Sequence, residues 1–472
     1  MSKKITKFSS LLLVFMLLLT ILIGCSQSQD ASKETDSTSE TDSTDVKQSE
    51  ESQVEEPVEE TYDFGGRTIT YAAWWNLEPV AGSSEGADKA LARLAEMQEK
   101  YNFTVSFINV PFDQILEQFT ASTLAGDPFA DIAWVTNHWF FPGLVANGFL
   151  LPVEDLGVFD FSEDKWNDGI IEASKYKGKI YGLATGGPEV RTGMYFNKAI
   201  FEREGLPNLY ELMVNKEWTW DKMLEIALKA TKDLNGDGTI DQWGLNSNLE
   251  WPLIYSNNAE GVRIIDGKPV FALTEANAIE AFQFWQDLIL VHKVCDIPPD
   301  GASWDYYIQQ FQDGKTAMCA AQWWVTERFS PNMADDYGFV LFPMGPKADD
   351  YVMHTDEVVF PVIPSAVKKP EEVAVFYDKY TDPFPDDEED PDGWKESFLS
   401  NARDMETVDI TMQMLKDKNY LKISWWRSFS ELEQLGWNTF WKISTGNQTP
   451  QVTMEEMAPQ AQAILDDALT RQ

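Results

Sequence analysis

The chain has 472 residues, of which 37 are Lys or Arg and 77 are Asp or Glu, and its formal net charge is −40. A chain this acidic is a poor partner for the phosphate backbone of nucleic acid, and its charge disfavours electrostatic docking on anionic lipid. Hydrophobic residues make up 43% of the chain, which excludes disorder throughout, and the length predicts at least two lobes or domains.

The first 25 residues have the pattern of a targeting segment. Three lysines within the first seven residues precede the apolar run SSLLLVFMLLLTILIG, which is short for a membrane span of about 20 apolar residues. The run leads into Leu22-Ile23-Gly24-Cys25, which resembles a bacterial lipobox and implies cleavage before Cys25 and diacylglycerol transfer to its sulfur. We therefore expect a signal peptide over residues 1–24 and a lipid anchor on the extracellular face of the cell membrane. The alternative is an ordinary signal peptide with an incidental cysteine.

The composition changes abruptly after the cysteine. Residues 26–60 are almost free of apolar side chains and hold 12 acidic residues against Lys33 and Lys47. Such a segment cannot bury enough surface to fold, and its like charges extend it. We interpret residues 25–61 as a lipidated cysteine and a disordered acidic tether that holds the folded part away from the membrane.

The ordered part begins near Tyr62 and alternates strands with helices. We expect a strand at Arg67–Ala73, a helix at Ala87–Tyr101, a strand at Phe103–Val110, a helix at Phe112–Ala125 and a strand at Asp131–Val135. This alternation predicts an α/β fold with a mostly parallel sheet, in which ligands sit beyond the carboxyl ends of the strands. Trp74, Trp75 and the run Asn137-His138-Trp139 follow two of these strands, so we take all five residues as candidate ligand contacts.

Further helices are expected downstream. Their patterns lie at Thr219–Thr231, Ala276–His292, Pro370–Tyr380 and Thr453–Leu469. Thr219 stands where a helix cap is expected, and Pro370 occupies a first-turn position that suits proline. The Pro- and Asp-rich segment Thr381–Gly393 predicts a loop.

Several short motifs downstream resemble those of one known family. They are Lys179–Leu183, Gly193–Lys198 followed by Phe201–Leu206, Thr219–Asp221, Phe311–Trp323 and Phe342–Pro346. Each motif is weak alone, but their number, order and spacing resemble the extracellular solute-binding lipoproteins of bacterial ABC importers, the family 1 group that includes maltose-binding protein. The resemblance covers roughly residues 62–472.

That resemblance implies a two-lobed, periplasmic-binding-protein-like α/β fold with a multi-strand hinge. The first lobe would comprise residues 62–184 and 350–385, and the second lobe residues 188–345 and 390–472. A solute would be captured between the lobes. The expected solute is a sugar or oligosaccharide, the expected partner is an ABC permease in the membrane, and the expected state is a monomer without enzymatic activity.

The tryptophans suit such a solute. A sugar presents C–H groups that aromatic faces cover, and hydroxyl groups that Asp, Asn, Glu and Arg bind. Trp323 and Trp324 also fall after a strand, and adjacent strand residues face opposite sides, so one of the two should face the ligand while the other packs. We expect Trp323 to face the ligand because it closes the Phe311–Trp323 motif. For any other single Trp, core packing is as good an interpretation.

Charged residues near the expected hinge complete the candidate site. Glu189 and Arg191 lie between two of the motifs and are good hydroxyl partners, although a solvated ion pair is an equal alternative. Asp356 and Glu357 precede the apolar segment Val358–Ile363 and are weaker candidates for the same role.

Other chemistries have less support in the sequence. His138, His292 and His354 are dispersed, so a zinc or iron cluster is not expected. Cys295 and Cys319 could form a disulfide in an exported protein or stay as buried thiols. The sequence has no GxSxG, HExxH or GxxxxGK[ST] motif. Two alternatives stay open, namely a lipid-anchored glycoside-active enzyme and a sensor that passes its ligand to a signalling partner.

The segment Asp233–Asp241 resembles the first nine positions of an EF-hand loop. Calcium prefers many oxygen ligands, and alternate positions supply them. The expected ligands are the side chains of Asp233, Asn235 and Asp237, the carbonyl of Thr239, and Asp241 directly or through water. The twelfth position is Gly244 where the full loop has a bidentate Glu, so a further ligand must come from elsewhere. We expect a structural calcium ion here, and a solvated turn is the alternative.

Overall fold

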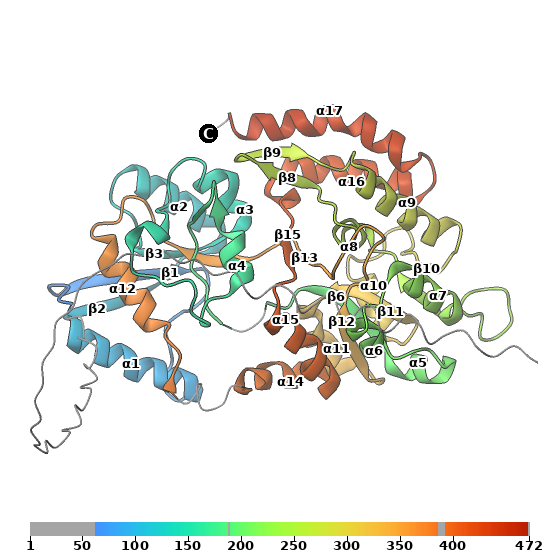
Figure 1. Cartoon of the computed structure of the whole chain (residues 1–472), viewed down its shortest axis with the longest axis horizontal. Helices are drawn as coiled ribbons and strands as arrows, with labels where there is room; N and C mark the ends of the chain where they lie inside the picture. Colours follow the sequence, from blue (N-terminus) through green and yellow to red (C-terminus); the bar gives the residue numbers. More distant parts are fainter. Residues whose placement is uncertain (1–61, 187–188, 386–391, 471–472) are drawn as a thin grey trace, which may run out of the picture. The chain divides into compact units, whose positions relative to one another are not determined.

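The structure is a computed structural model that describes residues 62–186, 189–385 and 392–470 (Figure 1). The expected signal peptide, the lipidated Cys25 and the acidic tether lie outside the described residues. Within the described ranges, none of the helices combines the length and the apolar character that a membrane crossing requires. The two-lobed α/β fold class is confirmed. The expected lobe boundaries stay a prediction.

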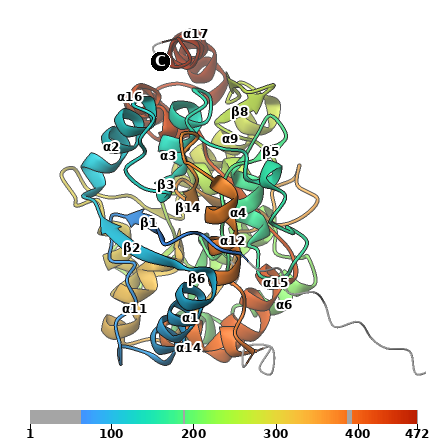
Figure 2. The same cartoon turned by 90° about the vertical axis from the view of Figure 1, so that its left-hand side faces the viewer.

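The first sheet is built from the N-terminal part of the chain and one later strand. Its strands, in spatial order, are β14 (Val359–Val362), β3 (Ile132–Thr136), β1 (Arg67–Ala73) and β2 (Phe103–Asn109). β1 runs parallel to β2 and β3, whereas β14 is antiparallel to β3. Figure 2 shows α2 (Phe112–Leu124) and α3 (Asn137–Trp139) above this sheet and α1 (Glu85–Tyr101) below it. The expected strand at 67–73 is confirmed.

The second sheet has five strands. In spatial order they are β10 (Cys295–Asp296), β7 (Trp243–Asn246), β11 (Thr316–Gln322), β6 (Thr192–Asn197) and β12 (Tyr337–Leu341). β7 is parallel to both β10 and β11, so the carboxyl ends of these three strands lie at one edge of the sheet. β6 pairs antiparallel with β11 and with β12.

The remaining helices are spread along the chain, and those from α5 to α11 lie between strands of the second sheet. They are α4 (Asp168–Ala173), α5 (Lys198–Glu204), α6 (Leu209–Val214), α7 (Trp220–Ala230), α8 (Glu250–Ser256), α9 (Ala276–Leu290), α10 (Tyr306–Gln312), α11 (Thr326–Asn332), α12 (Pro370–Tyr380), α14 (Glu396–Ala402), α15 (Gln413–Asp417), α16 (Ser430–Ser444) and α17 (Pro450–Ala468). The Thr219 hydroxyl caps α7 by accepting a hydrogen bond from the backbone N–H of Lys222. The helix expected at Thr219–Thr231 is thereby confirmed.

Short elements complete the chain. Single-turn helices lie at Phe140–Leu144, Val153–Leu156, Trp323–Val325, Gly393–Lys395, Thr407–Met412 and Trp426–Ser428. Three two-stranded sheets pair β4 (Lys175–Tyr176) with β5 (Lys179–Ile180), β8 (Val262–Ile265) with β9 (Lys268–Phe271), and β13 (Met353–Thr355) with β15 (Leu421–Ile423). The turn at Thr407–Met412 packs on β12, where the Thr411 hydroxyl donates to the Phe339 carbonyl oxygen at 2.7 Å.

Two buried features show how the core is held. Trp218 is fully buried and its indole N–H donates to the Leu341 carbonyl oxygen at 2.9 Å, which satisfies its one polar group. Cys295 and Cys319 are both free and buried, so the thiol interpretation is confirmed and the disulfide alternative is wrong. They stand on β10 and β11, which flank β7 on opposite sides. Burial raises the pKa of both thiols, which makes them inert.

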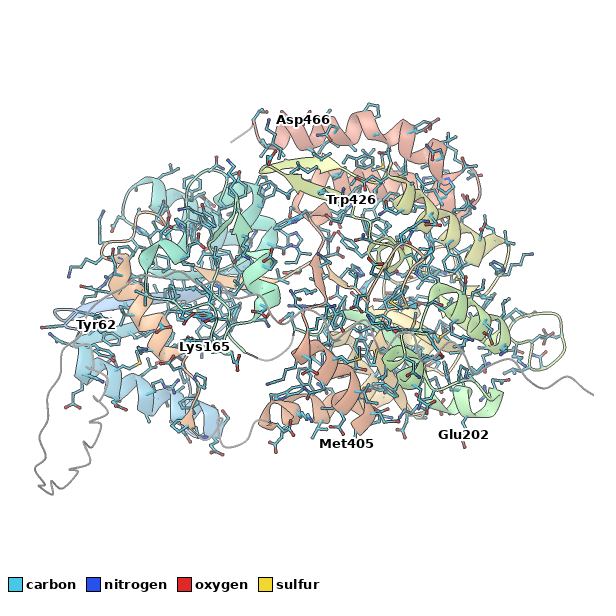
Figure 3. All side chains as sticks on the ribbon, in the orientation of Figure 1. Tyr62, Lys165, Glu202, Met405, Trp426 and Asp466 are labelled. Carbon is cyan, nitrogen blue, oxygen red and sulfur yellow. The ribbon has the colours of Figure 1, made fainter. Side chains whose placement is uncertain are left out.

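A buried lysine fastens the loop before α4 to α12. The Lys165 ammonium, labelled in Figure 3, contacts carboxylate oxygens of Asp382 at 2.6 Å, Asp378 at 2.7 Å and Glu163 at 3.1 Å. Burial alone would lower the pKa of Lys165, but the three carboxylates outweigh burial and raise it. The ammonium therefore stays charged and satisfies this acidic cluster.

Candidate functional site

Aromatic side chains gather at the carboxyl edge of the first sheet. Trp74 and Trp75 directly follow β1, Trp139 lies in α3 directly after β3, and Phe112 begins α2 just after β2. The ring centroids of Trp74 lie 4.7 Å from Trp75, 5.3 Å from Phe112 and 5.5 Å from Trp139. These four rings form a continuous cluster that we call the first platform.

The first platform is open to solvent on one side. Phe112 is 49% exposed and Trp75 is 36% exposed, whereas Trp74 and Trp139 are half-buried. Trp75 also rests against Trp134 of β3, with ring centroids 5.1 Å apart. Phe112 was not among the expected ligand residues, although its place at the start of a helix after β2 puts it on the same edge as the tryptophans. The platform can therefore bind a flat apolar surface.

The short helix α3 joins the first platform to the segment between β13 and β14. Asn137 is fully buried, and its backbone N–H donates to the Val358 carbonyl oxygen at 3.0 Å. Its side chain accepts a hydrogen bond from the Val358 N–H at 3.1 Å and donates to the Asp356 carbonyl oxygen at 3.2 Å. Asn137 thus serves to fix the backbone around Asp356. His138, its neighbour, is half-buried.

Of the two expected hinge residues, Arg191 contacts both β13 and the turn that follows β11. The Arg191 guanidinium and the Glu189 carboxylate form an ion pair. The backbone N–H of Arg191 approaches the Met353 sulfur at 3.0 Å, and its carbonyl oxygen accepts from the Trp323 N–H at 3.0 Å. Arg191 Nε is buried and has no hydrogen-bond partner in the part of the chain that the structure describes. This donor is therefore left unsatisfied by the described residues.

The two tryptophans after β11 have different surroundings. Trp323 is half-buried and packs against Phe339 at 5.1 Å between ring centroids and against Tyr195 at 6.4 Å with nearly parallel rings. Trp324 is 42% exposed and lies 6.2 Å from Trp304. Trp323 thus packs while Trp324 stays exposed, and the expectation that Trp323 contacts the ligand stays a prediction.

The carboxyl groups of Glu250 and Asp356 lie close enough to interact electrostatically. Burial raises the pKa of Glu250, at the start of α8, to about 7, and the Asp356 carboxylate adds to the shift. Burial also lowers the pKa of His354 to about 4, so its ring, which stacks on Tyr255 at 5.3 Å, is neutral at physiological pH. Asp356 Oδ1 is buried without a hydrogen-bond partner among the described residues. The neighbouring Glu357 is exposed.

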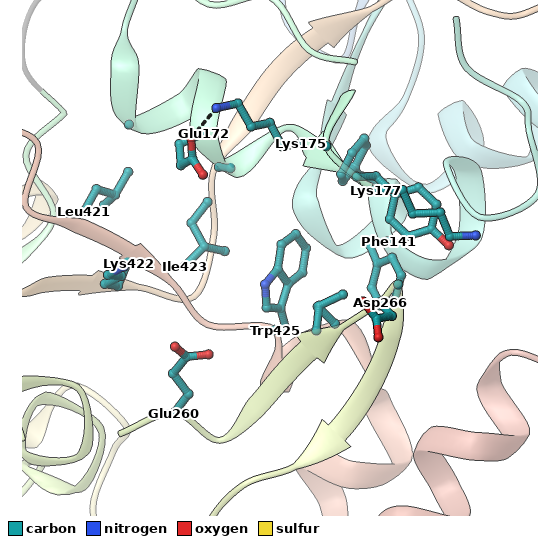
Figure 4. A pocket seen from close by; sticks show the side chains of 17 residues that line it. Phe141, Glu172, Lys175, Lys177, Glu260, Asp266, Leu421, Lys422, Ile423 and Trp425 are labelled. Atoms are coloured by element: carbon teal, nitrogen blue, oxygen red, sulfur yellow. Dashed lines mark hydrogen bonds and ion pairs between the residues drawn. The ribbon is translucent and has the colours of Figure 1, made fainter. Parts of the chain in front are cut away.

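Two cavities are lined by residues other than those of the first platform. A cavity of about 760 Å³ separates the β4–β5 hairpin from the β8–β9 hairpin, and Figure 4 shows Trp425 projecting into it. A second cavity, of about 510 Å³, includes Glu189 in its lining. Of the expected ligand residues, all of which the structure describes, Glu189 alone lines either cavity. None of the four residues of the first platform lines either of these two cavities.

The expected calcium ligands lie in the loop between α7 and β7. The Asp233 carboxylate accepts from the backbone N–H groups of Gly236 at 2.7 Å and Gly238 at 2.8 Å. Further bonds run from the Asp237 N–H to Asn235 Oδ1, from the Thr239 N–H to Asp237 Oδ1, and from the N–H groups of Leu234 and Asn235 to Asp241 Oδ2. Backbone N–H groups, that of Gly238 foremost for Asp233 and that of Thr239 for Asp237, lower the pKa of both carboxyls.

A metal ion needs several ligand atoms close together. Among the described residues, the one group of three His, Cys, Asp or Glu ligand atoms within 4.8 Å of one another is Glu163, Asp378 and Asp382, where the Lys165 ammonium already contacts all three. The carboxylates of the Asp233–Asp241 loop bond to backbone N–H groups instead, so they would have to turn to bind calcium together.

Known proteins resemble this chain in sequence and in fold. The family model described as bacterial extracellular solute-binding protein matches residues 81–383. The arabinooligosaccharide-binding protein of Halalkalibacterium halodurans is 26% identical over 233 residues, which is 49% of this chain and 49% of that protein. The matched stretch thus spans about half the length of that curated relative.

Solved structures with the same fold cover most of the chain. UspC of M. tuberculosis matches with a TM-score of 0.62 at 17% identity, over 84% of this chain and all of the other. The cyclic α-maltosyl-1,6-maltose binding protein of Arthrobacter globiformis matches with a TM-score of 0.60 at 16% identity, over 85% and 100% of the two chains. At such identity these likenesses show the fold alone. Because the family model covers more than half of the sequence, the chain belongs to the bacterial extracellular solute-binding protein family.

Proposed function

We propose that this protein binds a sugar or oligosaccharide on the first platform. The observation that carries the proposal is the four-ring cluster at the carboxyl edge of the first sheet, next to Asn137, which bonds to the segment at Asp356–Val358. Aromatic faces cover the C–H face of a sugar ring, while a guanidinium and a carboxylate bind its hydroxyl groups. The matched relative that is described as an arabinooligosaccharide-binding protein supports an oligosaccharide as the solute.

The proposed mechanism contains no chemical step. The solute docks on the first platform, the two sheets close over it by rotation about the segments at Glu189–Arg191 and Asp356–Val358, and an ABC permease receives the closed form. Solute binding shifts an equilibrium between open and closed conformations toward the closed one. We further propose that the protein acts as a monomer, held at the extracellular face of the membrane by lipid on Cys25.

We also propose a structural calcium ion in the Asp233–Asp241 loop. The support is the phase of the oxygen-bearing residues at positions 233, 235, 237, 239 and 241, which matches an EF-hand loop. In the present structure these side chains bond to backbone N–H groups of the same loop. Calcium would replace those bonds by direct coordination, with a further ligand from outside the loop.

A thermal-shift screen tests the sugar proposal. Purified protein is melted with mono- and oligosaccharides of arabinose, glucose and other pentoses and hexoses. A ligand present at 100 times its dissociation constant stabilises the native state by about 2.7 kcal/mol, which raises the melting temperature visibly. A solute that binds and is recovered intact supports a binding protein. Cleavage of the glycan by the purified protein would instead support the enzyme alternative.

A further inference from the structure

Trp304 has an unusual environment for a large apolar side chain. It is 69% exposed, and one of its ring contacts is Trp324, with ring centroids 6.2 Å apart. Exposing one indole to water is ordinary, but two exposed indoles in contact form an apolar surface that can bind a flat molecule. We call these two residues the Trp304 pair.

The Trp304 pair lies at the carboxyl edge of the second sheet. β10 ends at Asp296 and leads into the loop that carries Trp304, while β11 ends at Gln322 just before Trp324. Both strands are parallel to β7, so the loops that follow them emerge from the same edge. The Trp304 pair therefore lies at the carboxyl edge of the second sheet, just as the first platform lies at the carboxyl edge of the first sheet.

Contacts connect the Trp304 pair to the proposed site. The residue before Trp324 donates its backbone N–H to the carbonyl oxygen of Arg191 at 3.0 Å. Arg191 has the buried, unpaired Nε atom described above. Trp324 is thus the chain neighbour of the residue that bonds to Arg191, and it also contacts Trp304.

A charged pair borders the outermost ring. The Arg328 guanidinium carbon lies 5.9 Å from the centroid of the Trp304 ring, and its Nη2 donates to Asp305 Oδ2 at 2.7 Å. A hydrogen bond from Ser303 and the ion pair with Arg328 lower the pKa of Asp305, so this carboxyl is ionised at neutral pH. An aromatic face beside a planar donor and an acceptor matches a sugar ring, with its C–H face and its hydroxyl groups.

The loop that carries Trp304 is anchored at both ends. Asp296 at the end of β10 is buried and accepts a hydrogen bond from the Tyr306 hydroxyl at 3.2 Å. Within the loop, the Tyr306 N–H donates to the Ser303 carbonyl oxygen at 3.0 Å. Because these bonds hold the backbone on either side of Trp304, binding a solute there costs little ordering of the chain.

We propose that Trp304, Trp324 and Arg328 form a distal subsite for one sugar ring of an oligosaccharide. The inference rests on the proposed function and refines it, because such a subsite makes the length of the solute a determinant of affinity. A solute with a single ring cannot occupy the first platform and the Trp304 pair at once. Longer chains gain the stacking contact and the hydrogen bonds of Arg328 and Asp305.

Calorimetric titration of the full-length protein with an arabino-oligosaccharide ladder of one to six units tests this subsite. Trp304→Ala should weaken binding of the longest bound members about tenfold or more and leave the shortest bound member within about twofold of wild type. Trp304→Phe, which keeps an aromatic ring, should restore most of the lost affinity. Trp441→Ala is the matched control, because Trp441 is 49% exposed on α16.

Each outcome decides between the two proposals. An equal loss at every length, or no loss at any length, overturns the distal subsite while wild-type binding upholds the proposed function. If the wild-type protein binds no member of this ladder or of a matching malto-oligosaccharide ladder, the oligosaccharide proposal itself fails, and the subsite fails with it. Melting temperatures equal to wild type confirm that the variants are folded.

Discussion

At the residue scale, Trp323 and Trp324 show how one step along the backbone separates a packing ring from an open one. Trp323 contacts Phe339 and Tyr195 in the core, whereas Trp324 meets Trp304 at the surface. Both residues lie in the single-turn helix Trp323–Val325, and the three-residue repeat of such a helix points successive side chains in different directions, which predicts such a division. It does not say which member of the pair faces inward, because that depends on which face of β11 the core covers.

The two tryptophans should respond oppositely to truncation. Trp323→Ala removes a packed aromatic side chain and should lower the free energy of unfolding by about 2–4 kcal/mol. Trp324→Ala should leave the free energy of unfolding within about 0.5 kcal/mol of wild type and weaken solute binding by about 1 kcal/mol. Urea denaturation and calorimetric titration of both variants measure the two quantities. An unstable Trp324→Ala variant with unchanged affinity would contradict this assignment.

Glu250 should make stability depend on pH. Its pKa is raised from 4.5 to about 7 in the folded protein, so the folded state binds the proton more tightly than the unfolded state. The resulting stabilisation is complete below about pH 4.5 and is lost as the pH rises through 7. Glu250→Gln has no such proton to lose. Relative to wild type, this variant should gain roughly 1–3 kcal/mol of stability on going from pH 5 to pH 8.

Urea denaturation at the two pH values measures that difference. His354, whose pKa is lowered to about 4, acts in the opposite direction because its folded form resists protonation, and its contribution is lost as the pH falls below about 6.5. His354 is present in both proteins, so it largely cancels from the comparison. A constant difference between wild type and Glu250→Gln at pH 5 and pH 8 would refute the assigned shift.

At the scale of elements, much of the secondary structure could be predicted, because it is encoded locally. The helix expected at Ala87–Tyr101 is α1, which begins at Glu85 because the Ser84 side chain caps it by accepting from the Ala87 N–H. The helix expected at Thr453–Leu469 begins earlier, at Pro450, where proline suits the first turn.

The candidate site was harder to predict than the elements around it. Trp74, Trp75 and Trp139 could be proposed because each follows a strand whose pattern is clear. Trp304 could not be proposed in this way, because the preceding strand β10 has only two residues and therefore shows no periodic pattern in the sequence. Asn137 was proposed for its position, yet its burial and its bonds to the segment at Asp356–Val358 depend on the distant strand β14.

The loop between α7 and β7 carries a prediction of its own. If it binds calcium, removing the ion should lower the melting temperature, because the five loop residues that coordinate the ion would no longer be held together by it. The measurement is a thermal melt with chelator and with millimolar calcium, for wild type and for Asp237→Ala. The wild-type melting temperature should rise with calcium, and that of the variant should not. Identical wild-type melts under both conditions would show that the loop is only a turn.

At the scale of the whole molecule, attachment to the membrane depends on one residue. Cys25 supplies the thiol that lipid transfer requires, and serine cannot replace it. Cys25→Ser should therefore release the protein into the medium or leave an unprocessed precursor. Cell fractionation with immunoblotting, and mass analysis of the N-terminus, distinguish these products. Membrane retention of a correctly cleaved Cys25→Ser protein would argue against a lipid anchor at this position.

The hydrogen bond from the Trp323 N–H to the Arg191 carbonyl oxygen has a consequence for how closure can be observed. It couples the backbone at the hinge to the residue beside Trp324, so a rotation at Arg191 also displaces an exposed indole. Indole emission moves to shorter wavelength when water is excluded from the ring. If the proposed closure rotates the backbone at Arg191, solute binding should shift the emission of wild type more than that of a Trp324→Phe variant, so intrinsic fluorescence tests the closure without any added label.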